Sequence, residues 1–294
     1  MSITLADTLV SRLEGEPESI LEKNLDTVTQ GEFARSTAVR KVGEGLWEGH
    51  FSSNWLIGQT MNGGYAMAVA ARVLGQALPH PDPLTVTGHF LNRTEVGPVR
   101  CEVEILRAGG GSSTGSVKLF QKDDLKIVVT GTYGDMARQR GENRVLEAIP
   151  ADMPGLAACI DLPYRANQPF RQQMLQRMAP ASVRALEGEP DGSGRWQGWL
   201  DFTDGADKDL FSLVMFADAL PPPVFSIYGA EGWVPTLELT VRLHRRPRPG
   251  PLRCVFWANF ITEGIVNEEC LLWDSGDDLV AVASQAAKYR RANG

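Results

Sequence analysis

The sequence lacks an apolar run long enough to cross a membrane. A membrane-spanning helix requires about 18 or more consecutive apolar residues, whereas the longest apolar run, from Leu210 to Val224, is interrupted by Asp218 and three prolines. The first residues also lack a basic segment followed by an apolar one, which is the pattern of a secretory signal. We therefore expect a cytoplasmic protein with no membrane partner.

Cysteine and histidine are scarce, and neither forms a metal-binding pattern. Cys101, Cys159, Cys254 and Cys270 are far apart and include no Cys-x-x-Cys pair. The four histidines show no spacing typical of a metal site or a catalytic triad. We expect buried thiols in a reducing compartment, no metal site and no cofactor.

Basic residues are outnumbered by acidic ones, 29 to 36, and the net charge is −7. Binding to nucleic acid requires a basic surface that can pair with phosphates, so we expect no nucleic-acid partner. The composition, 43% hydrophobic and 22% charged in 294 residues, is that of a folded chain with room for two domains of ordinary size.

A short segment occurs twice in the sequence. Residues 97–101, Gly-Pro-Val-Arg-Cys, match residues 250–254, Gly-Pro-Leu-Arg-Cys, so Cys101 and Cys254 lie 153 positions apart. The segments around the two copies contain the same elements in the same order. A match of that extent is hard to obtain by chance, so we infer two copies of one structural unit.

Each copy is surrounded by alternating apolar and polar residues, which is the period of half-buried strands. In the second half Leu237, Leu239 and Val241 are predicted to share the buried face of one strand. The strands predicted for the first half are 46–51, 85–91, 101–105, 116–121 and 125–129. Those predicted for the second half are 195–202, 236–243, a run after residue 254, 268–273 and 279–283.

Each half also contains one helix that is apolar on almost every side, as a buried helix is. These helices are predicted from Gly64 to Leu78 and from about Asp207 to Leu220, and each is followed by proline. A sheet wrapped around one long buried helix is the hotdog architecture. The predicted fold class is therefore α+β, a tandem (double) hotdog in which each unit is an antiparallel sheet around a central helix.

The division of the chain follows from these elements. The predicted segments are an N-terminal hotdog unit at 1–136 with an extension at 1–40, a linker at 137–193, and a C-terminal hotdog unit at 194–294. Leu5, Leu9 and Leu13 suggest an amphipathic helix in the extension, and the linker is predicted to contain a short helix near Gln168–Met178.

Several motifs of this sequence resemble the thioesterase-like superfamily, specifically double-hotdog acyl-CoA thioesterases of the bacterial type II kind. The resemblance covers most of the chain, from about Leu46 to Tyr289. The motifs that carry it are Asn62-Gly63-Gly64-Tyr65, Phe216-Ala217-Asp218-Ala219-Leu220, the strand from Thr236 to His244, and the turn and strand from Trp273 to Gln285.

The resemblance implies a catalytic set of Asp218, Thr236 and Gln285, which in that family hold and activate the hydrolytic water. The expected activity is hydrolysis of acyl-CoA thioesters to the free acid and coenzyme A. From the residues themselves, Asp218 follows apolar Val214 and Met215 in the predicted helix. Apolar surroundings and the negative end of the helix dipole would both make this carboxylate a stronger base.

Other residues are candidates for binding the substrate. Gly63 and Gly64 open the first helix, where free N–H groups suit a thioester oxygen, although two glycines also suit a tight turn. Near the second strand block, Arg242, Arg245 and Arg246 are candidates for the phosphates of coenzyme A, or else belong to a solvated hairpin.

The first half looks like a degenerate copy of the site. Its helix carries no acidic residue, and Gly131 occupies the position that corresponds to Gln285. We therefore expect one working site in each chain.

Two other functions fit the same fold. A non-catalytic hotdog protein would bind acyl-CoA or a small hydrophobic ligand without hydrolysing it. A hotdog dehydratase would require a paired His and Asp near a helix start, and we find no such pair in the sequence. The sequence leaves monomer, dimer and tetramer open, because a fused pair already satisfies the basic hotdog dimer.

Overall fold

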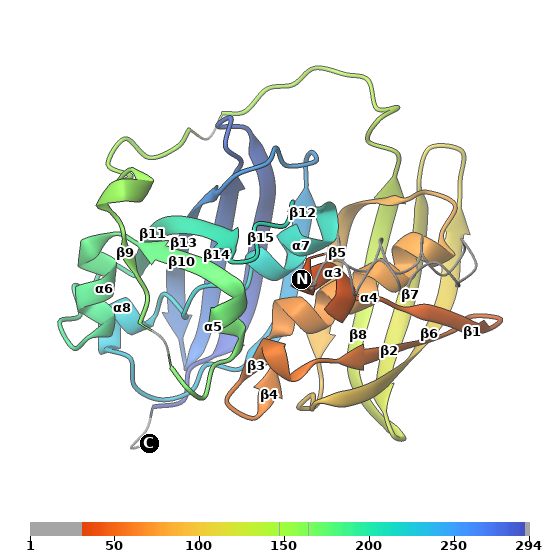
Figure 1. Cartoon of the computed structure of the whole chain (residues 1–294), viewed down its shortest axis with the longest axis horizontal. Helices are drawn as coiled ribbons and strands as arrows, with labels where there is room; N and C mark the ends of the chain where they lie inside the picture. The colour runs from red at the N-terminus through yellow and green to blue at the C-terminus, as the bar shows by residue number, and fades with distance from the viewer. Residues whose placement is uncertain (1–30, 147, 164, 292–294) are drawn as a thin grey trace, which may run out of the picture.

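One antiparallel sheet of thirteen strands forms the frame of the molecule (Figure 1). The computed structural model describes residues 31–146, 148–163 and 165–291. The helix predicted around Leu5, Leu9 and Leu13 lies outside the described residues. The strand order is β1-β2-β6-β7-β8-β5-β12-β15-β14-β13-β11-β10-β9, so the first six strands come from the N-terminal half and the rest from the C-terminal half.

The two halves have the same order of elements, which confirms the predicted double hotdog. The N-terminal half comprises β1 (Arg40–Gly43), β2 (Leu46–Phe51), β3 (Leu56–Ile57), β4 (Thr60–Met61), α4 (Gly63–Ala77), β5 (Asp82–Phe90), β6 (Gly97–Ala108), β7 (Ser113–Gln121) and β8 (Asp124–Gly134), with a single 3-10 turn at Ser53–Trp55. The corresponding elements of the C-terminal half are β11 (Arg195–Phe202), α7 (Leu210–Phe216), β12 (Thr236–Leu243), β13 (Leu252–Thr262), β14 (Ile265–Trp273) and β15 (Leu279–Lys288).

The halves join where β5 pairs with β12 in the middle of the sheet. Thr87 lies opposite Thr240 in this pair, and their hydroxyl oxygens are 2.9 Å apart. These two threonines are separated by 153 positions, the same offset as the repeated segment. An axis of approximate twofold symmetry therefore passes between them, and each half covers the inner edge strand of the other.

The two central helices differ in length. Asn62 caps α4 by accepting a hydrogen bond from the Tyr65 N–H at 2.8 Å, and the helix then runs for 15 residues with its middle buried. Asp209 and Ser212 cap α7 with reciprocal hydrogen bonds, but α7 ends after seven residues. The predicted helix from Asp207 to Leu220 is therefore too long at both ends, because Asp209 acts as a cap and the chain turns before the three prolines.

Part of the predicted linker belongs to the C-terminal sheet. The segment at 137–193 contains β9 (Ile160–Asp161), α5 (Phe170–Gln173), β10 (Met174–Met178) and α6 (Pro180–Leu186), and β10 pairs with β11. The helix predicted at Gln168–Met178 is wrong beyond Gln173. Met174, Gln176 and Met178 alternate with more exposed residues, which is the period of a strand.

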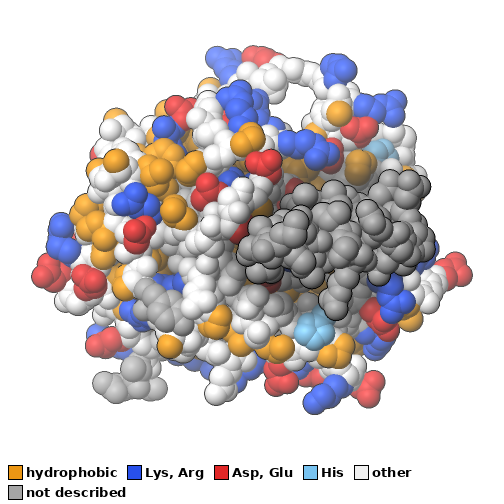
Figure 2. Space-filling view, viewed as in Figure 1, with side chains coloured by type: hydrophobic (Ala, Val, Ile, Leu, Met, Phe, Trp, Pro, Cys, Tyr) orange, Lys and Arg blue, Asp and Glu red, His pale blue; other side chains and the backbone are white. Residues whose placement is uncertain are grey.

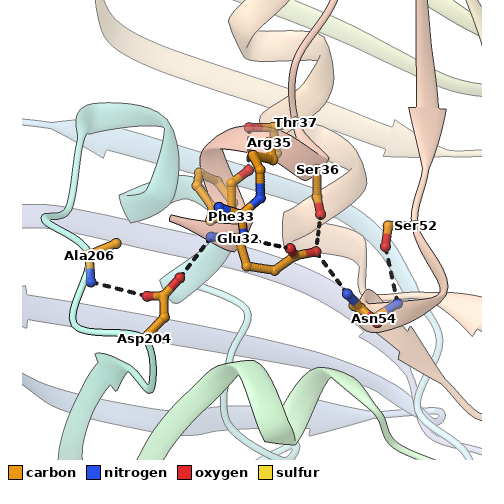
Figure 3. A network of polar contacts seen from close by, with 9 residues as sticks. All are labelled: Glu32, Phe33, Arg35, Ser36, Thr37, Ser52, Asn54, Asp204 and Ala206. Atoms are coloured by element: carbon orange, nitrogen blue, oxygen red, sulfur yellow. Dashed lines mark hydrogen bonds and ion pairs between the residues drawn. The ribbon is translucent and has the colours of Figure 1, made fainter. Parts of the chain in front are cut away.

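A short helix, α3 (Glu32–Ser36), connects the two halves (Figure 3). The backbone N–H of Glu32 donates to Asp204 Oδ2 at 2.7 Å, and its carboxylate accepts a hydrogen bond from Asn54 at 2.8 Å. The ring of Phe33 stacks on Phe202, with centroids 5.4 Å apart. The described end of the predicted extension 1–40 therefore packs against both halves of the chain.

Charges of both signs are interspersed on the face seen in Figure 2.

Another short helix, α8 (Phe225–Tyr228), follows the three prolines. Among the described residues, none of the helices combines the length and apolar character that crossing a bilayer requires.

Candidate active site

A cavity of about 520 Å³ lies between the two halves. Asp218, Thr236 and Gln285, the three predicted catalytic residues, all line it. Asn62 and Gly63 at the start of α4 form part of its wall, so both halves contribute to the cavity. The structure therefore brings the predicted residues together beside a space that can hold a ligand.

The two halves differ at the place where the cavity lies. In the N-terminal half, Gly115 of β7 pairs with Gly131 of β8, and a Cβ on either glycine would lie 3.1–3.2 Å from the tip of Leu74 on α4. In the C-terminal half the equivalent pair is Glu268 and Gln285. Glu268 and Gln285 both line the cavity. The helix α7 ends at its seventh residue, whereas α4 runs for 15 residues and places Leu74 over the glycine pair.

The register of the sheet confirms that Gly131 corresponds to Gln285. Gly131 pairs with Val86 on β5, and Gln285 pairs with Leu239 on β12. Val86 and Leu239 differ by 153 positions, which is the offset of the repeat. The first half therefore has glycine and leucine packing where the second half has polar side chains.

Asp218 lies in the turn that follows α7, with its carboxylate directed at the start of α4. Its Oδ2 accepts hydrogen bonds from the Gly64 N–H at 2.8 Å and from Asn62 Nδ2 at 3.1 Å. Burial raises the pKa of Asp218 to about 6, although the hydrogen bonds from Gly64, Asn62 and Gly63 oppose that change. At neutral pH the carboxyl is therefore ionised, and its raised pKa makes it a stronger base than an exposed aspartate.

The structure corrects the predicted effect of the helix dipole on Asp218. We expected the carboxylate at the negative end of its own helix, but it faces the positive N-terminal end of α4, which favours the ionised form. Desolvation alone is the cause that raises the pKa.

The structure shows a partner for one of the two glycines at the start of α4. The Gly64 N–H donates to Asp218, so it is not free for a thioester oxygen, and a role of Gly63 in binding that oxygen stays a prediction. A Cβ on Gly64 would lie 2.8 Å from the Cβ of Asp218 and 2.9 Å from the Met215 carbonyl oxygen. Gly64 therefore permits the close approach of α4 to the end of α7.

A β-bulge places Thr236 on the cavity side of the sheet. Thr236 pairs with Ala287 and Leu239 pairs with Gln285, with an irregular step between Thr236 and Glu238. Residues three apart in a regular strand face opposite ways, and the extra residue of the bulge puts Thr236 on the same face as Gln285. Leu237 is correspondingly displaced and is 43% exposed, contrary to the prediction that it shares the buried face with Leu239.

Gln285 has a partner that sequence reasoning missed. Its Nε2 donates to Glu268 Oε2 at 2.9 Å, and both side chains are more than nine-tenths buried. A signal was present in the sequence, because Glu268 interrupts an apolar face of β14 that includes Val266 and Cys270. A charged residue on the buried face of a strand is expected to have a specific partner.

The arginines predicted to bind phosphates do not line the cavity. Arg245 pairs with Asp278 at 2.5 Å, and Arg246 pairs with Asp82. Arg242 lies six residues from Thr236 along β12, which is about 20 Å in a strand. These three residues are therefore near the opposite end of the strand. The arginines that do line the cavity are Arg93, Arg165, Arg171 and Arg290.

A continuous sheet around two helices, with a cavity between its halves, defines a double hotdog protein. Models of two domains match the chain in order: an acyl-CoA thioesterase N-terminal domain at residues 51–134 and an acyl-CoA thioesterase C-terminal domain at residues 150–288. The second match begins at residue 150, so most of the segment predicted as a linker falls within it.

Solved structures agree with these matches. An inferred thioesterase II from Thermobifida fusca YX is 30% identical, with a TM-score of 0.83 over 89% of this chain and 98% of that one. The chain therefore belongs to the acyl-CoA thioesterase family. The acyl-CoA thioesterase II TesB2 from Mycobacterium marinum, 18% identical over 89% of this chain and 99% of that one, has a TM-score of 0.70 and shares the fold. A comparison with curated proteins gives no match.

Proposed function

We propose that this protein hydrolyses acyl-CoA thioesters with a water molecule that Asp218 activates. The observation that carries the proposal is the convergence of Asp218, Thr236 and Gln285 on one cavity between the halves. The family supports a thioester hydrolase. The identity of the substrate and the roles of the three side chains are part of the proposal.

The proposed reaction needs one base and two orienting groups. Asp218 accepts a proton from the water while the water oxygen attacks the carbonyl carbon of the thioester. Thr236 and Gln285 are neutral, so they orient the water without competing for its proton. The carbon–sulfur bond then breaks, the coenzyme A thiolate takes up a proton, and the acid and coenzyme A leave.

The test is thiol release from purified protein and acyl-CoAs of several chain lengths. We expect release with a rate that decreases as pH falls through about 6, since Asp218 must be ionised to accept a proton and its pKa is about 6. A thiol assay between pH 5 and 7.5 measures this acid limb. Thermal stabilisation by acyl-CoA without any thiol release would contradict hydrolysis and favour a binding protein instead.

Arg165 and Arg171 are the cavity residues that we propose for the phosphates of coenzyme A. Burial and the neighbouring positive charge of Arg165 lower the pKa of Arg171 to about 10, so Arg171 remains cationic at neutral pH. Within the described part of the chain, neither forms an ion pair with a carboxylate, and Arg171 Nε has no hydrogen-bond partner. Two neighbouring cations without an acid attract an anionic group.

We expect Arg165→Gln to raise the KM for acyl-CoA about 3- to 10-fold, because one partly exposed charge-assisted contact contributes about 1 kcal/mol. The kcat should change by less than about twofold, since the proposal assigns Arg165 to the phosphates and not to the reacting carbonyl. The matched control is Arg242→Gln, which removes the same charge outside the cavity. An acyl-pantetheine substrate lacks these phosphates, so its KM should not respond to either change. A KM that rises with Arg242→Gln alone would instead support the residues predicted from the sequence.

A further inference from the structure

Glu268 is a second buried carboxyl group in the cavity, and the reaction described above does not use it. It is 6% exposed and lies on β14 beside Gln285 of β15. Its Oε2 accepts the hydrogen bond from Gln285 Nε2, while its Oε1 is buried and has no hydrogen-bond partner among the described residues. A buried, half-satisfied carboxyl is costly to the fold, so its presence calls for a function.

The groups around Glu268 favour its neutral form. Burial is the largest cause, and the negative charge of Asp218 is the second, and together they raise the pKa of Glu268 to about 8 against the hydrogen bond from Gln285. On its own strand, Cys270 remains a neutral thiol because burial holds its pKa well above the usual range, and Cys254 of β13 does so for the same reason. Asp218 is thus the charged group whose field raises the pKa of Glu268.

The hydrogen bond between the two side chains fixes the Gln285 amide. With Nε2 bound to Glu268, the amide oxygen is the end of Gln285 that stays available to a ligand in the cavity. A water that gives one hydrogen bond to this oxygen and the other to Asp218 has its lone pair free for attack. The orientation of the amide therefore decides whether Gln285 accepts a hydrogen bond from the water or donates one to it.

We propose that Glu268 is a positioning residue for thioester hydrolysis, which holds the Gln285 amide with its oxygen toward the water beside Asp218. This inference rests on the proposed function. The neutral acid holds the amide without adding a second negative charge next to Asp218. Ionisation of Glu268 would repel the negative charge that develops on the thioester oxygen, so activity should decline above about pH 8.

Two substitutions at position 268 separate these effects. In Glu268→Gln, the new side chain cannot ionise, but its oxygen can still accept the hydrogen bond from Gln285. We therefore expect a kcat at pH 7 within about threefold of wild type and no decline of activity above pH 8. Glu268→Leu removes the acceptor, so kcat should fall about 10- to 100-fold while KM changes less than about twofold. Glu104→Gln, an exposed residue of β6, is the matched control and should retain the wild-type pH profile.

The measurement is kcat and KM from the loss of thioester absorbance between pH 5.5 and 9.5, with thermal unfolding as a check of folding. A folded Glu268→Leu variant with wild-type kcat would overturn the proposal, as would a Glu268→Gln variant that keeps the alkaline decline. If Glu268→Leu does not fold, the pH profile of Glu268→Gln decides alone. Failure of the proposed function is distinct, because the wild-type protein itself would then hydrolyse no thioester.

Discussion

Asp218→Asn should lower kcat for acyl-CoA hydrolysis by about 10²- to 10⁴-fold, the usual contribution of a general base. Asparagine has the same shape and can still accept the hydrogen bond from Gly64, but its amide cannot take a proton from water. The KM should change little, since the cavity keeps its volume. Thiol release at saturating substrate measures the effect, and residual activity within tenfold of wild type would remove Asp218 from the role of base.

Thermal unfolding is the control for this substitution. The pKa of Asp218 predicts whether the variant is more or less stable than wild type. The native pKa of Asp218 is about 6, above the 3.8 of an unperturbed side chain, so the native state binds the proton more tightly than the unfolded chain. The contribution of Asp218 to stability therefore decreases as pH rises from about 4 to about 6. Above that range, the buried charge of Asp218 destabilises the native state by its full amount. At about pH 7.5, Asp218→Asn should melt no lower than wild type. An inactive variant that also melts much lower would point to a structural role.

Leu74→Ala should lower the free energy of unfolding by about 2–5 kcal/mol, because a fully buried leucine is replaced and a void remains. Leu74 is 0% exposed, and its two methyl groups face Gly115 and Gly131, which have no side chain to fill the space. Denaturant-induced unfolding followed by tryptophan fluorescence measures the loss. The kcat of the folded variant should stay close to wild type, since Leu74 is not part of the cavity wall.

The matched control for Leu74 is Leu106→Ala on β6. Leu106 is 53% exposed, so the same truncation should cost less than about 1 kcal/mol. Equal losses at the two positions would contradict the packing described for the first half. A large loss of kcat in folded Leu74→Ala would instead indicate that the first half contributes more to catalysis than the start of α4.

The sequence was sufficient to predict the frame of the fold because the frame depends on short-range periodicity. The predicted bounds of β2, β11 and β12 agree with the structure, since alternation along a half-buried strand is visible in one sequence. The short α7 was overestimated, because apolar residues continue through Ala217 and Leu220 after the helix has ended. Met174–Met178 was taken for helix, since a run of five residues carries too little periodicity to distinguish helix from strand.

The candidate site was harder to predict, because its contacts join residues far apart in the sequence. The hydrogen bond from Gly64 to Asp218 spans 154 positions, so sequence alone could not show that the helix start holds the carboxyl. The bulge that turns Thr236 into the cavity has no residue signature of its own. The partner of Gln285 becomes visible only when β14 and β15 are placed in register.

Under the proposed function, the half without Asp218 also contributes to the chemistry. Asn62 and Gly64 belong to the N-terminal half, yet both donate hydrogen bonds to Asp218 of the C-terminal half. The proposed mechanism therefore requires both halves in one molecule. Substitutions that abolish the proposed activity are therefore expected in both halves, at Asn62 and Gly64 as well as at Asp218.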